Sequence, residues 1–129
     1  MKLYIVANRL PVKAVPRQDS YTFVRSEGGL ATGLDSLQIS MEKHWIGWPG
    51  VCVDNARQQI EIRQHLETMD FHPIFLSEEQ YHDYYEGYSN STIWPLCHYF
   101  FSHTTVRKEY WESYQKVNAL FCEEICKQV

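Results

Sequence analysis

The sequence lacks long apolar runs and clusters of positive charge, and both absences exclude large classes of protein. The apolar stretch nearest the N-terminus, residues 3–7, is five residues long, which is too short for a signal peptide or a membrane span. Twelve Lys and Arg oppose sixteen Asp and Glu, so the net charge is −4, and no basic run occurs. Because phosphate backbones are bound by clustered cations, we expect no nucleic-acid partner and no membrane association.

Sequence patterns for disulfides and metals are absent as well. The four cysteines, at positions 52, 97, 122 and 126, form no C-x-x-C pair and no disulfide framework, which predicts buried, reduced thiols in a cytoplasmic protein. The six histidines show no H-E-x-x-H motif and no Cys/His ligand spacing, and no G-x-S-x-G nucleophile motif occurs. The sequence therefore predicts neither a metal site nor a cofactor.

Aromatic residues, in contrast, are abundant. Nineteen of the 129 residues are aromatic, among them nine Tyr and four Trp, while 44% of the chain is apolar and 22% is charged. This composition excludes a disordered tail and fits one domain, or part of one. Flat side chains beside polar groups line many carbohydrate and nucleotide sites, so the aromatic content favours such a pocket.

The apolar periodicity predicts an α/β fold. Buried strands are expected at residues 3–7, 45–48 and 71–76, and a hairpin is expected to pair residues 13–15 with 21–24. Helices are expected from the glycines at 28 and 29 to Met41, over 56–68 on the surface, from the capping box at Ser77 to about Tyr85, and from about Val106 onward. Strands that alternate with helices predict parallel βαβ units, and the unbroken run at 3–7 predicts a central strand.

The C-terminal end of the sequence indicates an incomplete domain. The last predicted helix reaches Val129, and no strand follows it. A crossover helix normally returns the chain to its sheet. We therefore expect a partial Rossmann-like domain taken from a longer protein.

Two short segments are candidates for binding phosphate. Gly28 and Gly29 stand at the expected first turn of a helix, where free N–H groups and the helix dipole attract anions. A flexible turn explains the same glycines. Arg9 follows the first strand, at the strand end where open α/β sheets bind ligands, and its planar guanidinium suits phosphate. An exposed arginine with no ligand is the alternative there.

Two further segments concentrate aromatic residues. Residues 84–95 place four aromatic side chains among small polar residues, across an expected helix–loop–helix junction. This pattern fits a sugar site, or equally an aromatic core beneath a surface loop. Residues 45–50 read W-I-G-W-P-G, and two tryptophans two positions apart on a strand share one face, which favours a packing role.

Taken in order, these segments resemble the trehalose-6-phosphate synthases, which are glycosyltransferases of the two-domain GT-B fold. The resemblance covers the whole chain, and six segments carry it with the family's spacing: 6–12, 28–30, 45–50, 71–76, 84–96 with His98 and Tyr99, and 111–121. It implies that residues 1–129 are the N-terminal portion of the acceptor-side domain. The rest of that domain, beginning with an H-D-Y-H-L segment, and the nucleotide-sugar-binding C-terminal domain are expected outside this sequence.

The resemblance also implies a reaction and the residues that take part in it. The family transfers glucose from a nucleotide sugar, usually UDP-glucose, to glucose 6-phosphate with retention of the α configuration. Matched residue by residue, Arg9, Tyr85 and Trp94 are expected around the acceptor phosphate, and Gly28 and Gly29 at the donor pyrophosphate. No metal or cofactor is implied, and the full-length protein is expected to be a homo-oligomer.

Other interpretations of the same residues stay open. Groups that stabilise the departing diphosphate are expected in the second domain, so the isolated chain is expected to be inactive. A non-catalytic module that binds a sugar phosphate is one alternative. A related synthase with another acceptor, such as glycerol 3-phosphate, is a second. The donor base is not determined by this sequence, because the residues that contact it are expected in the second domain.

Overall fold

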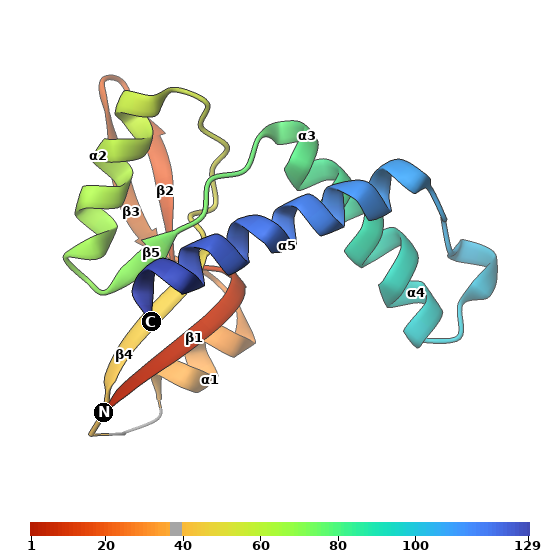
Figure 1. Ribbon diagram of the computed structural model, residues 1–129, viewed down its shortest axis with the longest axis horizontal. Coiled ribbons are helices and arrows are strands. Elements are labelled where there is room, and N and C mark those ends of the chain that lie inside the picture. The colour runs from red at the N-terminus through yellow and green to blue at the C-terminus, as the bar shows by residue number, and fades with distance from the viewer. Residues whose placement is uncertain (37–39) are drawn as a thin grey trace. The chain divides into compact units, whose positions relative to one another are not determined.

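The computed structural model describes residues 1–36 and 40–129, and it divides into two compact units, Met1–Phe75 and Leu76–Val129 (Figure 1). The first unit contains a parallel sheet of three strands in the order β1-β4-β5. These strands are β1 (Lys2–Arg9), β4 (Glu42–Trp48) and β5 (Phe71–Pro73). The predicted α/β class with parallel βαβ units is confirmed, because β4 pairs in parallel with both neighbours.

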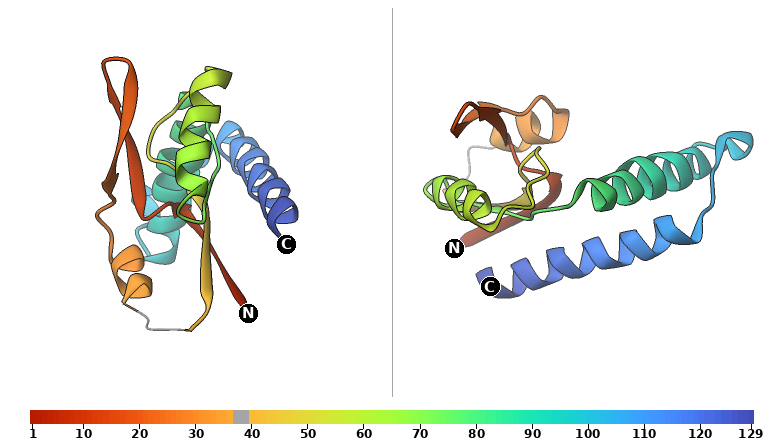
Figure 2. Two further views of the ribbon diagram at one scale, coloured as in Figure 1. Left: turned by 90° about the vertical axis from the view of Figure 1, so that its left-hand side faces the viewer. Right: turned by 90° about the horizontal axis from the view of Figure 1, so that it is seen from above.

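The hairpin and the second helix complete the first unit. Strands β2 (Val12–Arg17) and β3 (Ser20–Arg25) pair antiparallel, as the polar tip between them predicts. Helix α2 (Ala56–Glu67) lies beside this hairpin in both figures (Figures 1 and 2), and the Phe23 ring stacks on His65 with centroids 3.9 Å apart. Ile62 and Leu66 of α2 are fully buried in the core, so this helix is more deeply buried than its polar composition predicts.

The prediction that residues 3–7 form a central strand is wrong for the part of the chain that the structure describes. Strand β1 lies at one edge of the sheet, and the central strand is β4. Residues 44–48 of β4 are all buried, whereas Val6 of β1 is 48% exposed. An apolar run shows that a strand is covered on much of its surface, but it does not distinguish an edge position from a central one.

The first helix is shorter than its apolar spacing predicts. Helix α1 spans Gly29–Asp35, and Leu30 within it is 61% exposed. The predicted helical position Leu37 lies outside the described residues, and Met41 stands in a bend just before β4. Within the described residues, the helical spacing of apolar residues therefore does not correspond to a long buried helix.

The second unit is helical. Helix α3 (Glu78–Tyr81) continues without a break into a π-helix, η1 (His82–Ile93), and then into α4 (Trp94–Cys97). A 3₁₀ turn, η2 (Phe101–His103), leads toward the long helix α5 (Lys108–Gln128). The right-hand view of Figure 2 shows α5 running back alongside the α3–η1–α4 segment. The capping box predicted at Ser77 and Gln80 is present, with both of its hydrogen bonds.

The expected loop within residues 84–95 is absent, because the backbone there stays helical. Its small polar residues instead stabilise the wider π turn. The Ser89 hydroxyl donates to the Tyr84 carbonyl at 2.9 Å, and the Ser91 hydroxyl donates to the Glu86 carbonyl at 2.7 Å. Each of these bonds spans five residues, which is the spacing of a π-helix. Residues that favour loops in isolation therefore stabilise a wide helix here.

The four cysteines are free thiols, as predicted, but their predicted burial is wrong for three of them. Cys97, Cys122 and Cys126 are exposed, and Cys52 is half-buried. The three exposed thiols all lie in helices of the second unit, on the sides of those helices that face solvent. Among the described residues, no helix has the length and apolar character needed to cross a membrane.

Candidate functional site

Arg9 lies at the carboxyl end of the parallel sheet, as its position in the sequence predicts. It is the last residue of β1 and pairs with Trp48, the last residue of β4, after an irregularity in the register that begins at Val6. The Leu10 amide donates to the Trp48 carbonyl at 3.0 Å. The Arg9 guanidinium carbon lies 5.4 Å from the centre of the Trp48 ring, an attractive cation–π distance. The aromatic ring therefore helps to position the exposed guanidinium at the strand end.

Gly47 permits the close approach of β1 that places Arg9. A Cβ atom at Gly47 would lie 2.6 Å from the Ala7 carbonyl oxygen and 3.1 Å from both the Arg9 carbonyl carbon and the Leu10 nitrogen. Distances this short to backbone atoms leave no room for a side chain. The W-I-G-W-P-G segment, interpreted from sequence as a packing motif, thus packs directly against the Arg9 backbone.

Gly28 and Gly29 belong to the first unit, as Arg9 does. The Ser26 amide donates to the Pro11 carbonyl at 2.8 Å, which joins the chain just before the glycines to the chain just after Arg9. Gly28 is the N-cap of α1 and Gly29 its first residue, and no side chain caps this helix. Among residues 1–36 and 40–129, a Cβ at either glycine would meet nothing within 4 Å. The fold therefore leaves open space beside both residues, and their contact with a pyrophosphate stays a prediction.

Tyr85 and Trp94 belong to one continuous helical segment of the second unit. They are nine positions apart, which is two and a half turns at about 3.6 residues per turn of an α-helix and would place them on opposite faces. A π-helix takes more residues per turn, so the same interval amounts to about two turns. The Trp94 amide donates to the Ser89 carbonyl, five residues earlier, so the π pattern persists to this point. The π pattern therefore covers the interval between the two residues.

Trp94 forms the wall of an open aromatic cavity. Its side chain is 52% exposed, and its ring stacks on His98 with centroids 3.9 Å apart. A cavity of about 310 Å³ is lined by Trp94, Pro95, Phe100 and His103. Tyr85 is half-buried and stacks on Tyr81 at 5.4 Å. An exposed indole face beside a cavity of this size can pack against the apolar face of a sugar ring.

One tyrosine beside these residues has an altered acidity. Burial raises the pKa of Tyr84 above its ordinary value of 10.0, and the neighbouring phenols of Tyr114 and Tyr85 raise it further. Tyr84 therefore stays neutral at physiological pH. It contributes a stacking surface against Tyr114, with centroids 5.9 Å apart, rather than a charge.

The structure brings together some of the predicted site residues but not all of them. Arg9, Gly28 and Gly29 belong to the first unit, and Tyr85 and Trp94 belong to the second. The convergence of Arg9 with the two aromatic residues therefore stays a prediction.

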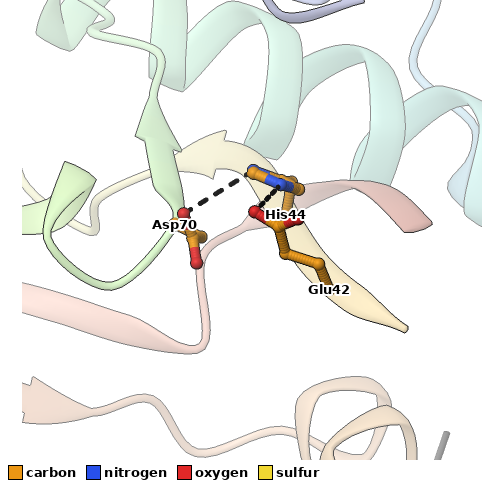
Figure 3. A group of neighbouring side chains, drawn as sticks. All are labelled: Glu42, His44 and Asp70. Atoms are coloured by element: carbon orange, nitrogen blue, oxygen red, sulfur yellow. Dashed lines mark ion pairs between the residues drawn. The ribbon is translucent and has the colours of Figure 1, made fainter. Parts of the chain in front are cut away.

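Sequence reasoning missed the supporting roles of Gly47 and Trp48 beside Arg9. It also missed a group of three side chains at the opposite end of the sheet: Glu42, His44 and Asp70 (Figure 3). Only the spacing Glu42-x-His44, on one face of a strand, hinted at this group.

Comparison with known proteins identifies the family. The family model described as Glycosyltransferase family 20 matches residues 1–129. The alpha,alpha-trehalose-phosphate synthase [UDP-forming] of Botryotinia fuckeliana is 37% identical over 129 residues, which cover 99% of this chain and 25% of that protein. The trehalose-6-phosphate synthase of Mycolicibacterium vanbaalenii is 44% identical over 125 residues, which cover 92% of this chain and 25% of that protein. The chain thus spans about a quarter of the length of these relatives.

A solved structure shares the fold. The alpha,alpha-trehalose-phosphate synthase (UDP-forming) of Burkholderia xenovorans, solved in complex with glucose-6-phosphate, superposes with a TM-score of 0.67 at 22% identity, covering 99% of this chain and 25% of that one. This likeness confirms that the arrangement is that of the N-terminal, Rossmann-like part of such enzymes. The family model, which matches every residue, and the relatives that align with nearly the whole chain lead to one conclusion: the chain belongs to glycosyltransferase family 20.

Proposed function

We propose that this chain is the acceptor-side part of a retaining glucosyltransferase that transfers glucose from UDP-glucose to glucose 6-phosphate and forms trehalose 6-phosphate. The observation that carries the proposal is the family match over all of residues 1–129, which includes Arg9, Tyr85 and Trp94. Relatives named UDP-forming trehalose-phosphate synthases support the donor, and the Burkholderia xenovorans complex with glucose-6-phosphate supports the acceptor.

In this proposal, Arg9 binds the phosphate of glucose 6-phosphate. A guanidinium can donate two parallel hydrogen bonds to a phosphate, and these charge-assisted bonds are about twice as strong as neutral ones. The Trp48 ring, 5.4 Å from the guanidinium carbon, and the β1–β4 pairing restrict where this group can lie. Less side-chain entropy is then lost when phosphate binds.

Tyr85 and Trp94 complete the acceptor site in this proposal. Trp94 presents an exposed ring face beside a cavity of about 310 Å³, and Tyr85 adds a phenolic hydroxyl two π turns earlier. The N–H groups at Gly28 and Gly29 bind the donor pyrophosphate, because the open space beside both glycines admits a phosphate oxygen close to the backbone.

Titration of the 129-residue chain with glucose 6-phosphate, followed by calorimetry, tests this assignment. We expect Arg9→Ala to weaken binding at least about tenfold, because a hydrogen bond to a charged group contributes about 1.5–3 kcal/mol. Arg57→Ala, which removes an exposed arginine from α2, is the matched control and should bind like the wild type. Circular dichroism verifies that both variants are folded.

Two outcomes would contradict the proposal. If Arg9→Ala binds glucose 6-phosphate as tightly as the wild type does, Arg9 is not part of the acceptor site. If the chain binds glycerol 3-phosphate more tightly than glucose 6-phosphate, the acceptor is different and the synthase makes another product. Glucose without phosphate should bind weakly, since it offers nothing to the guanidinium.

A further inference from the structure

A second cluster of polar side chains lies at the amino-terminal ends of β4 and β5, away from the strand ends that hold Arg9 and Trp48. Glu42 is the first residue of β4, His44 follows it two positions later, and Asp70 immediately precedes β5. One potential ligand atom from each of these residues lies within 4.8 Å of the other two. Figure 3 shows both carboxylates directed toward the His44 ring.

His44 is the fixed member of this cluster. Its side chain is 8% exposed, and its ring stacks on Tyr4 with centroids 5.1 Å apart. Its Nδ1 atom lies 3.2 Å from Nε2 of the buried His72, a hydrogen-bonding distance. Its Nε2 atom is buried and makes no hydrogen bond to the residues that the structure describes, although Oε1 of Glu42 lies 3.2 Å away.

The contact with His72 is compatible with two tautomers of His44, and metal binding at Nε2 requires the one that donates from Nδ1. In the tautomer that donates from Nδ1 to His72, the Nε2 atom of His44 carries a lone pair that points toward the Glu42 carboxylate. A lone pair and an anionic oxygen 3.2 Å apart repel each other unless a cation lies between them. Histidine ligands of metals commonly donate their second ring N–H to an acceptor in this way, which fixes the ring and its tautomer.

The two carboxylates have the freedom that metal ligands need. The side chains of Glu42 and Asp70 are 52% and 51% exposed. The separation of 3.2 Å between Glu42 Oε1 and His44 Nε2 matches two ligands that share one ion at about 2.0–2.2 Å. Asp70 Oδ1 lies 3.8 Å from Nδ1 of the same ring, and one ligand atom of each of the three residues lies within 4.8 Å of the other two. Water from the solvent side can fill the remaining coordination positions.

We propose that Glu42, His44 and Asp70 bind a divalent first-row transition-metal cation. One imidazole and two carboxylates form a nitrogen and oxygen donor set that suits Zn²⁺, Co²⁺ or Mn²⁺. The ion would neutralise two negative charges and join the start of β4 to the start of β5. Because this site lies at the end of the strands opposite Arg9, it stabilises the sheet and does not contact the acceptor.

Titration of the 129-residue chain with Co²⁺ as the probe tests this site. We expect one equivalent to bind, with weak visible bands typical of nitrogen and oxygen ligands, and to raise the melting temperature, because an ion that binds only the folded state stabilises it. Glu42→Gln and Asp70→Asn keep the size of each side chain and should each weaken binding at least about tenfold. His44→Gln should abolish it.

The matched control is the exposed His82–Asp83 pair of η1, whose Nδ1 and Oδ1 atoms lie 2.8 Å apart. His82→Gln should leave Co²⁺ binding and the metal-dependent rise in melting temperature unchanged. Intense near-ultraviolet charge-transfer bands would show that the exposed thiolates of Cys122 and Cys126 hold the ion, and would overturn the proposal. Equal binding by the wild type and by both Glu42→Gln and Asp70→Asn would overturn it too, as would the absence of any stoichiometric binding.

Discussion

At the scale of single residues, the position of Arg9 depends on the absence of a side chain at Gly47. The Ala7 carbonyl oxygen would lie 2.6 Å from a Cβ there, and the Arg9 carbonyl carbon and the Leu10 nitrogen would lie at 3.1 Å. Backbone atoms of a paired strand cannot move aside as the end of a flexible side chain can. Any residue other than glycine at position 47 would therefore displace the end of the strand that carries Arg9.

We therefore predict that Gly47→Ala lowers the free energy of unfolding by about 1–3 kcal/mol, the usual cost of overpacking. It should also weaken glucose 6-phosphate binding, because Arg9 moves with the strand. Urea denaturation and calorimetry measure the two effects. Gly33→Ala is the control, since a Cβ at Gly33 meets no atom of the described part of the chain within 4 Å, and it should be neutral or stabilise α1 by up to about 1 kcal/mol. A Gly47→Ala variant as stable as the wild type would contradict the prediction.

Tyr84 gives a prediction about pH. Burial, and then the phenols of Tyr114 and Tyr85, raise its pKa above 10.0 in the folded chain. The unfolded chain therefore loses this proton first as the pH rises. The stabilisation is complete below about pH 10 and is lost as the pH rises through the folded-state pKa.

Accordingly, melting temperatures measured from about pH 8 to pH 11 should fall less steeply for Tyr84→Phe than for the wild type. Tyr99→Phe, at a side chain that is 81% exposed, is the control and should follow the wild-type curve. Parallel curves for all three proteins would show that Tyr84 does not titrate abnormally.

At the scale of elements, the π-helix η1 determines how the aromatic part of the site is presented. It packs on α5 through aromatic contacts, including the tilted rings of Tyr88 and Tyr114 with centroids 4.4 Å apart. Gly87 allows this contact, because a Cβ at Gly87 would lie 2.7–2.9 Å from three atoms of the Tyr110 ring. The close packing of η1 on α5 therefore depends on Gly87.

We predict that Gly87→Ala destabilises the chain by about 1–3 kcal/mol, through overpacking against Tyr110. In a Tyr110→Ala background the same substitution should cost little or nothing, because the ring that it meets is gone. Chemical denaturation of the four proteins of this double-mutant cycle gives the coupling energy. An equal cost of Gly87→Ala in both backgrounds would contradict the proposed contact.

Most elements could be predicted from sequence, and the failures have physical causes. The hairpin, β4, α2 and the capping box at Ser77 follow from patterns within a few residues of one another. The edge position of β1 depends on which strands pair with it, and the π-helix depends on the backbone accommodating small polar residues that alone favour a loop. Neither property can be predicted from the spacing of apolar residues within one segment.

The candidate site likewise has a part that could be predicted from sequence and a part that could not. Arg9 at a strand end and the glycines before a helix are recognisable by position. The supporting contacts are not, because Gly47 meets Ala7 forty positions earlier in the chain and Asp70 approaches His44 from the turn before β5. Contacts between distant segments appear only when the chain is folded.

At the scale of the whole molecule, the chain covers 25% of the length of its Botryotinia and Mycolicibacterium relatives, so most of their residues have no counterpart in it. In the proposed reaction, negative charge builds on the departing nucleoside diphosphate. Arg9 and the N–H groups of Gly28 and Gly29 are the phosphate-binding groups that this chain supplies to the proposed site. Losing one preorganised donor typically costs about 10²–10³ in rate, and we expect the donors that stabilise the departing diphosphate to lie outside residues 1–129.

We therefore predict that these 129 residues alone transfer no glucose, even where they bind glucose 6-phosphate. A coupled assay for released nucleoside diphosphate, with glucose 6-phosphate and several sugar nucleotides, measures this directly. Arg9→Ala and a reaction without protein provide the two baselines, and wild-type turnover should equal both. Turnover clearly above the protein-free reaction, and abolished by Arg9→Ala, would show that this chain carries its own catalytic groups. The groups that stabilise the leaving diphosphate would then have to be sought within residues 1–129.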